Sequence, residues 1–194
     1  PPEDSAIQFS GTYNTKSMEI NLPQPLANFY IEMWIHPDLL TQKIPPVYQS
    51  HLLMTDKHQL YFDTNDDEYK VKITDNNLIT TFPLGQKISY YGWNHLIFAS
   101  LTKLGEQLTE ISVSVTNTFV SVGSVNGQTN INKLCFCNKD ENCCGVSNVL
   151  WMDMFIRELK IWDASIVNEN TLFDFDKFTH IVIGGLLYWF PFTI

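Results

Sequence analysis

The sequence predicts an all-β protein that folds as a sandwich of two antiparallel sheets. Nearly every apolar run is short, rich in β-branched and aromatic residues, and bounded by turn-forming residues. These runs recur roughly every ten residues, which is typical of a sandwich. No stretch with helical periodicity is longer than about two turns. Splitting the strands into two units would leave open sheet edges, so we expect residues 1–194 to form a single domain.

The expected strands follow one another from the N-terminus with short turns between them. Residues 6–9 and 17–20 alternate with period two, and residues 29–35 form a longer strand that ends at Pro37. That strand places two sets of residues on opposite faces: Tyr30, Glu32 and Trp34 on one, and Phe29, Ile31, Met33 and Ile35 on the other. The further expected strands are 51–54, 59–62, 69–73, 78–82, 93–99, 110–115 and 119–122. The best helix candidate is short, residues 165–172, with Asp163 or Ser165 as its N-cap.

Composition sets broad limits on the function. Hydrophobic residues make up 44% of the 194 residues and aromatic residues 13%, which is enough for a substantial core. Charged residues make up only 17%, and the formal net charge is −9. Such a charge argues against nucleic acids and anionic membrane surfaces as partners, and is compatible with calcium in the medium.

All four cysteines lie within ten residues, as Cys135, Cys137, Cys143 and Cys144. Zinc sites pair separated Cys-x-x-Cys knuckles or combine Cys with His, and no His lies near this cluster. Two disulfides in an oxidising compartment are therefore expected. Cys135 with Cys144 and Cys137 with Cys143 fit, as does the crossed alternative, whereas a bond between adjacent cysteines would strain the backbone. We expect the cluster to staple one excursion from the core.

The order of several segments resembles a known family. Residues 6–11 (Ala-Ile-Gln-Phe-Ser-Gly), 18–20 and 29–37 (Phe-Tyr-Ile-Glu-Met-Trp-Ile-His-Pro) resemble the opening of a laminin-G-like, concanavalin A-like jelly roll. Four further segments resemble the later strands of that family: 93–97 (Trp-Asn-His-Leu-Ile), 112–115, 156–164 (Ile-Arg-Glu-Leu-Lys-Ile-Trp-Asp-Ala) and 187–190. The resemblance implies a jelly-roll sandwich with one short helix near the C-terminus. The cysteine cluster departs from the plain pattern and is similar to versions in large cell-surface proteins of ciliated protists.

The resemblance and the residues together imply a non-catalytic protein. Glucanases on this jelly roll carry a Glu-x-Asp-x-Glu strand that holds two carboxylates about 5–5.5 Å apart. The nearest stretch here, residues 151–155, has Asp153 alone between Trp151 and Phe155. Asp174 and Asp176 follow the expected helix rather than lining a sheet. We therefore expect no enzyme activity and no catalytic residues.

Two sets of residues are candidates for ligands. Asp63, Asn65, Asp66 and Asp67 place hard oxygens in one loop, as calcium requires; the alternative is an acidic turn in solvent. The expected cofactor is thus none, or one calcium ion. A sugar-stacking surface is the second candidate, with Tyr90 and Tyr91 as its most site-like pair; the alternative is that these aromatic residues belong to the core. The full aromatic set is Trp34, Tyr48, Tyr61, Tyr90, Tyr91 and Trp93.

These observations predict an extracellular or cell-surface module that acts in recognition or structural assembly. A calcium-dependent carbohydrate-binding module is the alternative. The chain begins with Pro-Pro-Glu-Asp-Ser and no leader, so we expect it to be a piece of a larger secreted or surface protein. The expected partners are other domains or subunits of that assembly, or glycans, with no nucleic acid and no membrane insertion by this segment. Few charges and many aromatic residues favour a broad protein contact.

Overall fold

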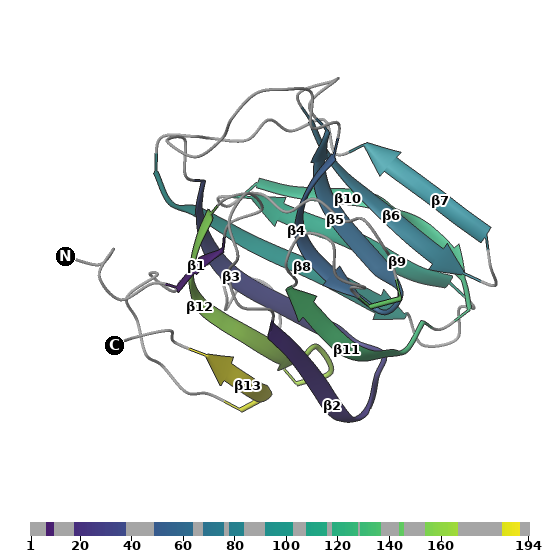
Figure 1. The fold of residues 1–194 in the computed structure, drawn as a ribbon. Coiled ribbons are helices and arrows are strands. Elements are labelled where there is room, and N and C mark those ends of the chain that lie inside the picture. The colour runs from purple at the N-terminus through teal and green to yellow at the C-terminus, as the bar shows by residue number, and fades with distance from the viewer. Residues whose placement is uncertain are drawn as a thin grey trace.

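The structure is a computed structural model of the chain. It describes residues 7–9, 18–37, 49–63, 68–75, 78–83, 92–102, 108–115, 118–127, 129–136, 144–145, 154–166 and 184–190. Their regular elements are all strands, arranged in two antiparallel sheets (Figure 1). The expected all-β, two-sheet sandwich is therefore confirmed.

One sheet has seven strands and the other has six. The seven-stranded sheet has the order β1-β12-β3-β8-β9-β10, with β13 also paired to β12; its strands are β1 (Ile7–Phe9), β12 (Met154–Asp163), β3 (Phe29–Pro37), β8 (Asn94–Thr102), β9 (Leu108–Val115), β10 (Thr118–Asn126) and β13 (Leu186–Phe190). The six-stranded sheet has the order β2-β11-β4-β5-β6-β7; its strands are β2 (Met18–Leu26), β11 (Ile131–Phe136), β4 (Gln49–Thr55), β5 (His58–Asp63), β6 (Glu68–Asp75) and β7 (Leu78–Pro83).

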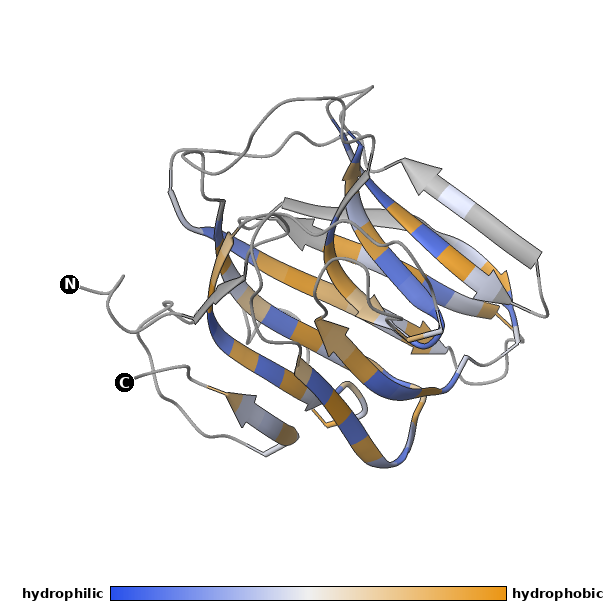
Figure 2. Cartoon of the chain, in the orientation of Figure 1, coloured by the Kyte–Doolittle hydropathy of each residue, from blue (hydrophilic) through white to orange (hydrophobic). Residues whose placement is uncertain are grey.

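Alternation along each strand decides which side chains enter the space between the sheets. In β3 the side chains of Phe29, Ile31, Met33 and Ile35 are fully buried in the main core. The six-stranded sheet contributes residues such as Leu60 and Val71 from the opposite side. Apolar and polar residues accordingly alternate along the central strands (Figure 2). This is the period of two on which the sequence prediction was based.

The outer face of the seven-stranded sheet has a second apolar cluster. Tyr30, Ile97, Ala99 and Trp162 are buried there, and half-buried Leu101, Ala164 and Leu186 pack against them. The sheet is thus buried on both faces near β3, β8 and β12. A charged side chain on this outer face therefore needs a hydrogen-bonding partner within the protein.

Strand β12 is the branch point of the seven-stranded sheet. One edge pairs with β3 from Met154 to Asp163, and the other pairs with β1 near Met154 and with β13 near Leu159. Arg157 lies opposite Trp34 and Lys160 opposite Glu32, so the bulge holds one extra residue. Glu158 in this bulge has a φ of 53°, a left-handed conformation that costs a non-glycine residue about 1–2 kcal/mol.

The helix expected over residues 165–172 lies mostly outside the described residues. Its first residues form a turn after β12, in which the Asp163 carboxylate accepts hydrogen bonds from the backbone N–H and the hydroxyl of Ser165. Asp163, one of the two residues predicted as the N-cap, therefore caps this turn, while the helix and its N-cap stay predictions. So does the assignment of residues 1–194 to one domain. Within the described ranges, no helix has the length and apolar character needed to cross a membrane.

Candidate functional site

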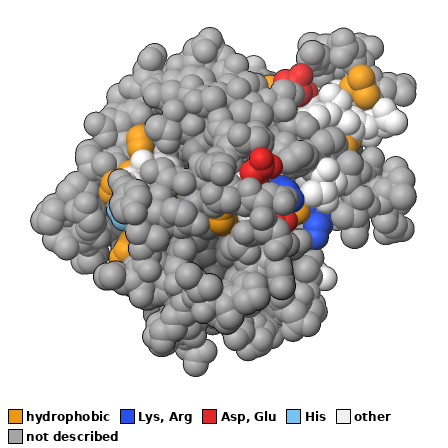
Figure 3. All heavy atoms as spheres, turned by 90° about the horizontal axis from the view of Figure 1, so that it is seen from above, with side chains coloured by type: hydrophobic (Ala, Val, Ile, Leu, Met, Phe, Trp, Pro, Cys, Tyr) orange, Lys and Arg blue, Asp and Glu red, His pale blue; other side chains and the backbone are white. Residues whose placement is uncertain are grey.

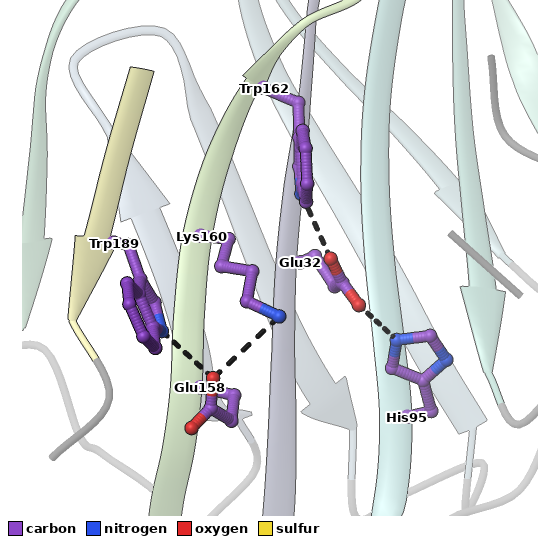
Figure 4. A network of polar contacts seen from close by, with 6 residues as sticks. All are labelled: Glu32, His95, Glu158, Lys160, Trp162 and Trp189. Carbon is purple, nitrogen blue, oxygen red and sulfur yellow. Dashed lines mark hydrogen bonds and ion pairs between the residues drawn. The ribbon is translucent and has the colours of Figure 1, made fainter. Parts of the chain in front are cut away.

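A buried carboxylate links three strands on the outer face of the seven-stranded sheet. Glu32 of β3 accepts a hydrogen bond from His95 Nε2 of β8 at Oε1 and one from Trp162 Nε1 of β12 at Oε2, both at 2.8 Å (Figure 4). Glu32 is only 1% exposed, and His95 and Trp162 are buried with it. Each carboxylate oxygen therefore has a donor, which offsets the cost of burying the charge.

A second buried carboxylate lies at the bulge of β12. Glu158 Oε2 accepts a hydrogen bond from Trp189 Nε1 of β13 at 2.8 Å and lies 3.6 Å from Lys160 Nζ (Figure 4). Glu158 and Lys160 are both 1% exposed. The left-handed backbone of Glu158 thus coincides with a side chain that ties β13 to the sheet. We refer to Glu32, His95, Glu158, Lys160, Trp162 and Trp189 together as the outer-face network.

The outer-face network has a structural role in this conformation. Glu32 and Glu158 are too deeply buried to reach a glycosidic bond, and both use their oxygens to hold neighbouring strands together. Each carboxylate also has a nitrogen-bearing side chain as a close neighbour, because His95 contacts Glu32 and Lys160 contacts Glu158. Removing one member of such a set leaves the other charge or donor buried without its partner, which is costly.

Aromatic side chains continue from the network toward one end of the sheet. Trp34 stacks on the imidazole of His95, with ring centroids 4.5 Å apart and an interplanar angle of 19°. Beyond it, the His36 ring meets Trp93 edge-on at 5.5 Å and Phe155 edge-on at 6.3 Å. Trp34, His36, Trp93 and Phe155 are half-buried. We call these four residues the aromatic end.

The aromatic end combines ring surface with polar imidazole atoms at the protein surface. In the view from above, hydrophobic side chains reach the surface beside a histidine at one margin of the molecule (Figure 3). Trp34 is supported from below, because His95 is itself held by Glu32. A ring fixed in this way loses little conformational entropy when it contacts a ligand.

The six aromatic residues expected to form one stacking surface are not all brought together. Trp34 and Trp93 lie at the aromatic end, but Tyr61 lies in β5 of the other sheet and is buried. Its ring packs against His51 at 5.5 Å, and Lys72 Nζ lies 5.6 Å from the ring centroid. A single surface including Tyr61 is therefore wrong, because β3 and β5 belong to different sheets. Tyr48, Tyr90 and Tyr91 lie outside the described residues.

Of the four residues predicted to bind calcium, only Asp63 is described. It ends β5, is largely buried, and its Oδ2 pairs with Lys70 Nζ of β6 at 3.1 Å. Asn65, Asp66 and Asp67 lie outside the described residues, as do Asp153, Asp174 and Asp176. Among the described residues, no group of three or more His, Cys, Asp or Glu side chains could hold a metal ion.

The cysteine cluster is joined to the main core. A disulfide links Cys135, in β11, to Cys144, and their Cα atoms are 6.2 Å apart. Cys135 is fully buried, and Cys144 packs against the core. The expected staple is therefore anchored in the core at this end, because β11 lies between β2 and β4 in the six-stranded sheet. Cys137 and Cys143 lie outside the described residues, and their bond stays a prediction.

We expect intact domain to weigh four hydrogens less before reduction than after it, because both cysteine pairs are oxidised. Mass spectrometry with and without a reductant measures this. The Cys137→Ser, Cys143→Ser double variant should retain the Cys135–Cys144 bond and differ by two hydrogens.

Loss of the Cys135–Cys144 bond should lower the free energy of unfolding by about 2–3 kcal/mol, since the closed loop is short. Free thiols at Cys137 and Cys143, or bound zinc, would contradict the second bond.

The outer-face network was missed by the sequence reasoning, although one signal was present. Glu32 is a charged residue between Ile31 and Met33, both of which are predicted core residues. Because Glu32 lies on the same face of the strand as Trp34, that face was expected to carry a charged group as well as aromatic rings. Its partners could not be identified, because His95 is 63 residues away and Trp162 is 130 residues away.

Comparisons with known proteins identify a shared fold. No protein-family model and no curated protein sequence matches the chain. Among solved structures, it is similar to the binding domain of Paraclostridial Mosquitocidal Protein 1, with a TM-score of 0.54, 11% identity, and coverage of 87% of this chain and 42% of that chain. It is also similar to domains LG4-5 of the mouse laminin α1 chain, with a TM-score of 0.52, 8% identity, and coverage of 79% of this chain and 41% of that chain.

This chain therefore spans less than half the length of either of those two structures. At identities of 11% and 8%, the similarity concerns the fold. It agrees with the two antiparallel sheets of this chain. The chain has the laminin-G-like, concanavalin A-like jelly-roll fold that its sequence resembles.

Proposed function

We propose that the chain is a non-catalytic recognition module of a larger extracellular or cell-surface protein, and that it contacts its ligand through the aromatic end. The observation that carries this proposal is the arrangement of Trp34 on His95 and Glu32. It presents a half-buried ring on a rigid and fully buried support. Aromatic anchors of this kind dominate the binding energy of many interfaces.

The geometry of the carboxylates supports a role without catalysis. A glycosidase needs one carboxyl group as acid and a second as nucleophile or base, both in contact with the substrate. Glu32 and Glu158 are instead engaged by indole N–H groups in the interior. In this structure the two carboxylates therefore connect neighbouring strands through hydrogen bonds.

Two further observations support the proposed setting and the proposed class of ligand. The Cys135–Cys144 disulfide is of a kind that persists in oxidising compartments and is rare in the cytosol. The formal net charge of −9 disfavours nucleic acid as the ligand. A partner protein of the same assembly, or a glycan, fits both observations.

Calcium-dependent carbohydrate binding is a second candidate, and the aromatic end favours it. A sugar ring can stack its C–H face on Trp34 or Phe155, while the His36 imidazole offers hydrogen-bonding atoms beside them. The calcium would be held near Asp63 together with Asn65, Asp66 and Asp67. Because Asp63 pairs with Lys70, calcium binding there would require Asp63 either to contact Lys70 and the ion together or to break its pair with Lys70.

We expect Trp34→Ala and Phe155→Ala each to weaken ligand binding at least about tenfold, because each removes a ring of the contact surface. The immobilised domain is measured against the neighbouring segments of its parent protein and against a glycan array, in calcium and in EDTA. Leu108→Ala is the matched control, because Leu108 is an exposed apolar residue on β9. Its neighbour Thr109 pairs with Thr102, at the end of β8 remote from the aromatic end. Circular dichroism of each variant checks the fold.

The outcomes separate the candidates. Glycan binding that disappears in EDTA would favour the second candidate, and binding to parent segments the first. Binding that both aromatic substitutions leave unchanged would refute the aromatic end as the contact site. Turnover of any glycan on the array would overturn the non-catalytic assignment.

A further inference from the structure

The turn that joins β4 to β5 is tied to two neighbouring strands. It consists of residues 55–58, and we call it the β4–β5 turn. Its Asp56 carboxylate accepts hydrogen bonds from the backbone N–H and the side-chain amide of Asn132 in β11, at 3.0 and 3.1 Å. Its Lys57 carbonyl accepts a hydrogen bond from the Thr74 N–H of β6 at 2.9 Å. A movement of the turn therefore breaks contacts with strands on both sides.

His58 also closes this turn against the opposite sheet. It is 2% exposed, and its ring centroid lies 6.1 Å from that of Phe29 in β3 and 5.2 Å from that of Phe98 in β8. In the next strand of its own sheet, Ile73 of β6 lies opposite it. The neutral imidazole thus fills an apolar position between the two sheets.

Neither nitrogen of this ring has an acceptor for an added proton. Thr55 Oγ1 accepts hydrogen bonds from the N–H groups of Lys57 and His58, and lies 2.9 Å from His58 Nδ1. Both acceptor positions of the hydroxyl are used, so its hydrogen is donated to Nδ1. The ring proton is then on Nε2, which has no hydrogen-bond partner among the described residues. A charged ring in this position would bury two N–H donors without acceptors, which is costly.

The charged groups that act on the ring belong to its own turn. Burial lowers the pKa of His58 to about 4, while Asp56 raises it and Lys57 lowers it by smaller amounts. On the neighbouring β11, Lys133 pairs with Glu19 of β2. The titratable residues described on β3, β8 and β6 occupy positions that alternate with core residues and so face away: Glu32, His36, His95, Glu68, Lys70 and Lys72. Asp56 is therefore the carboxylate that a charged His58 would pair with.

We propose that the β4–β5 turn is an acid-operated latch between the two sheets. Neutral His58 closes the latch by lying between Phe29 and Phe98. Protonated His58 leaves that position and pairs with Asp56 at the surface, which releases Asn132 and separates the turn from β11 and β6. The two positions of one ring supply the two states that a histidine switch requires. The latch uses no residue of the aromatic end, so it extends beyond the proposed recognition role.

Hydrogen exchange of the whole domain, followed by NMR, tests the latch. The amides of Asp56, Thr74 and Asn132 report on it, because each donates a hydrogen bond to or from the turn. We expect their protection factors to fall at least about twentyfold between pH 7.5 and pH 5, since the released ring has its usual pKa of 6.5 or higher and the enclosed ring one of about 4. The fall should not depend on urea at low concentrations, because a local opening exposes little surface.

Three variants test the roles of the two side chains. His58→Phe should abolish the fall, because an apolar ring gains no charge. His36→Phe is the matched control and should keep the wild-type fall, since His36 lies at the aromatic end. Asp56→Asn removes the outer charge and keeps an amide oxygen for Asn132, so the fall should be smaller than in wild type. Circular dichroism of each variant checks the fold.

Three results would overturn the latch. One is an equal fall in wild type and His58→Phe, and another is exchange at these amides only through urea-dependent unfolding of the whole sandwich. The third is a full wild-type fall in Asp56→Asn, because the ring would then leave its position without the proposed partner.

Discussion

Glu32→Ala should lower the free energy of unfolding by about 2–6 kcal/mol, because it leaves two buried donors without an acceptor, at about 1–3 kcal/mol each. The substitution removes the acceptor of His95 Nε2 and of Trp162 Nε1 at once, and both donors are buried. It also withdraws the support beneath Trp34, since His95 is the ring on which Trp34 stacks. Urea unfolding at neutral pH, followed by tryptophan fluorescence, measures the loss.

Two matched variants test whether the loss of stability in Glu32→Ala comes from the buried hydrogen bonds of Glu32. Glu32→Gln keeps the shape and one acceptor oxygen, so we expect it to cost about 1–2 kcal/mol. Glu19→Ala removes a more exposed carboxylate that lies 3.7 Å from Lys133, and should cost less than about 0.5 kcal/mol. If Glu32→Ala cost no more than Glu19→Ala, the outer-face network would not stabilise the sheet.

Local patterns were sufficient for the architecture, because a period of two determines which residues of a strand face the core. Residues 29–35 illustrate this, since the four residues assigned to the apolar face are those fully buried in the structure. The ends of strands were harder to predict. Strand β2 continues through Pro23 and Pro25 to Leu26, which is tolerated because β2 is an edge strand with an irregular pairing to β11.

The site depended on contacts that local patterns do not contain. Strand β11 and the bulge at Glu158 had no sequence signal, because a left-handed non-glycine residue is selected by its tertiary surroundings. The Cys135–Cys144 pair was one of two pairings that the spacing allowed. Trp34, His95 and Glu32 were each visible as residues, but only the pairing of β3 with β8 brings them together.

A buried histidine between the sheets leads to a second large effect. His58 begins β5, and its ring contacts Phe29 at 6.1 Å and Phe98 at 5.2 Å, both in the opposite sheet. Thr55 Oγ1 accepts hydrogen bonds from the N–H groups of Lys57 and His58 and lies 2.9 Å from His58 Nδ1. The threonine hydroxyl therefore donates to Nδ1, which assigns the ring proton to Nε2. That Nε2 has no hydrogen-bond partner in the described structure.

Burial lowers the pKa of His58 to about 4 from its usual value of 6.5, with a smaller opposing effect of Asp56 and a smaller reinforcing effect of Lys57. The unfolded chain therefore binds a proton below pH 6.5 that the folded chain accepts only near pH 4. The stability that the neutral ring contributes is complete above pH 6.5 and is lost as the pH falls toward 4. Between neutral pH and pH 5 this single group should remove about 2 kcal/mol from the free energy of unfolding.

His58→Phe should abolish that part of the pH dependence, because an apolar ring cannot charge between Phe29 and Phe98. Urea unfolding of wild type and variant at pH 7.5 and at pH 5 measures the contribution of His58 to this pH dependence. The titration of the remaining groups cancels in the difference between the two proteins. His36→Phe is the matched control, because His36 is half-buried at the aromatic end, and it should retain the wild-type acid sensitivity. Thr55 keeps its two backbone hydrogen bonds in the His58→Phe protein, so the turn that starts β5 should persist. Equal acid destabilisation of wild type and His58→Phe would show that the charge of His58 is not what limits the sandwich at low pH.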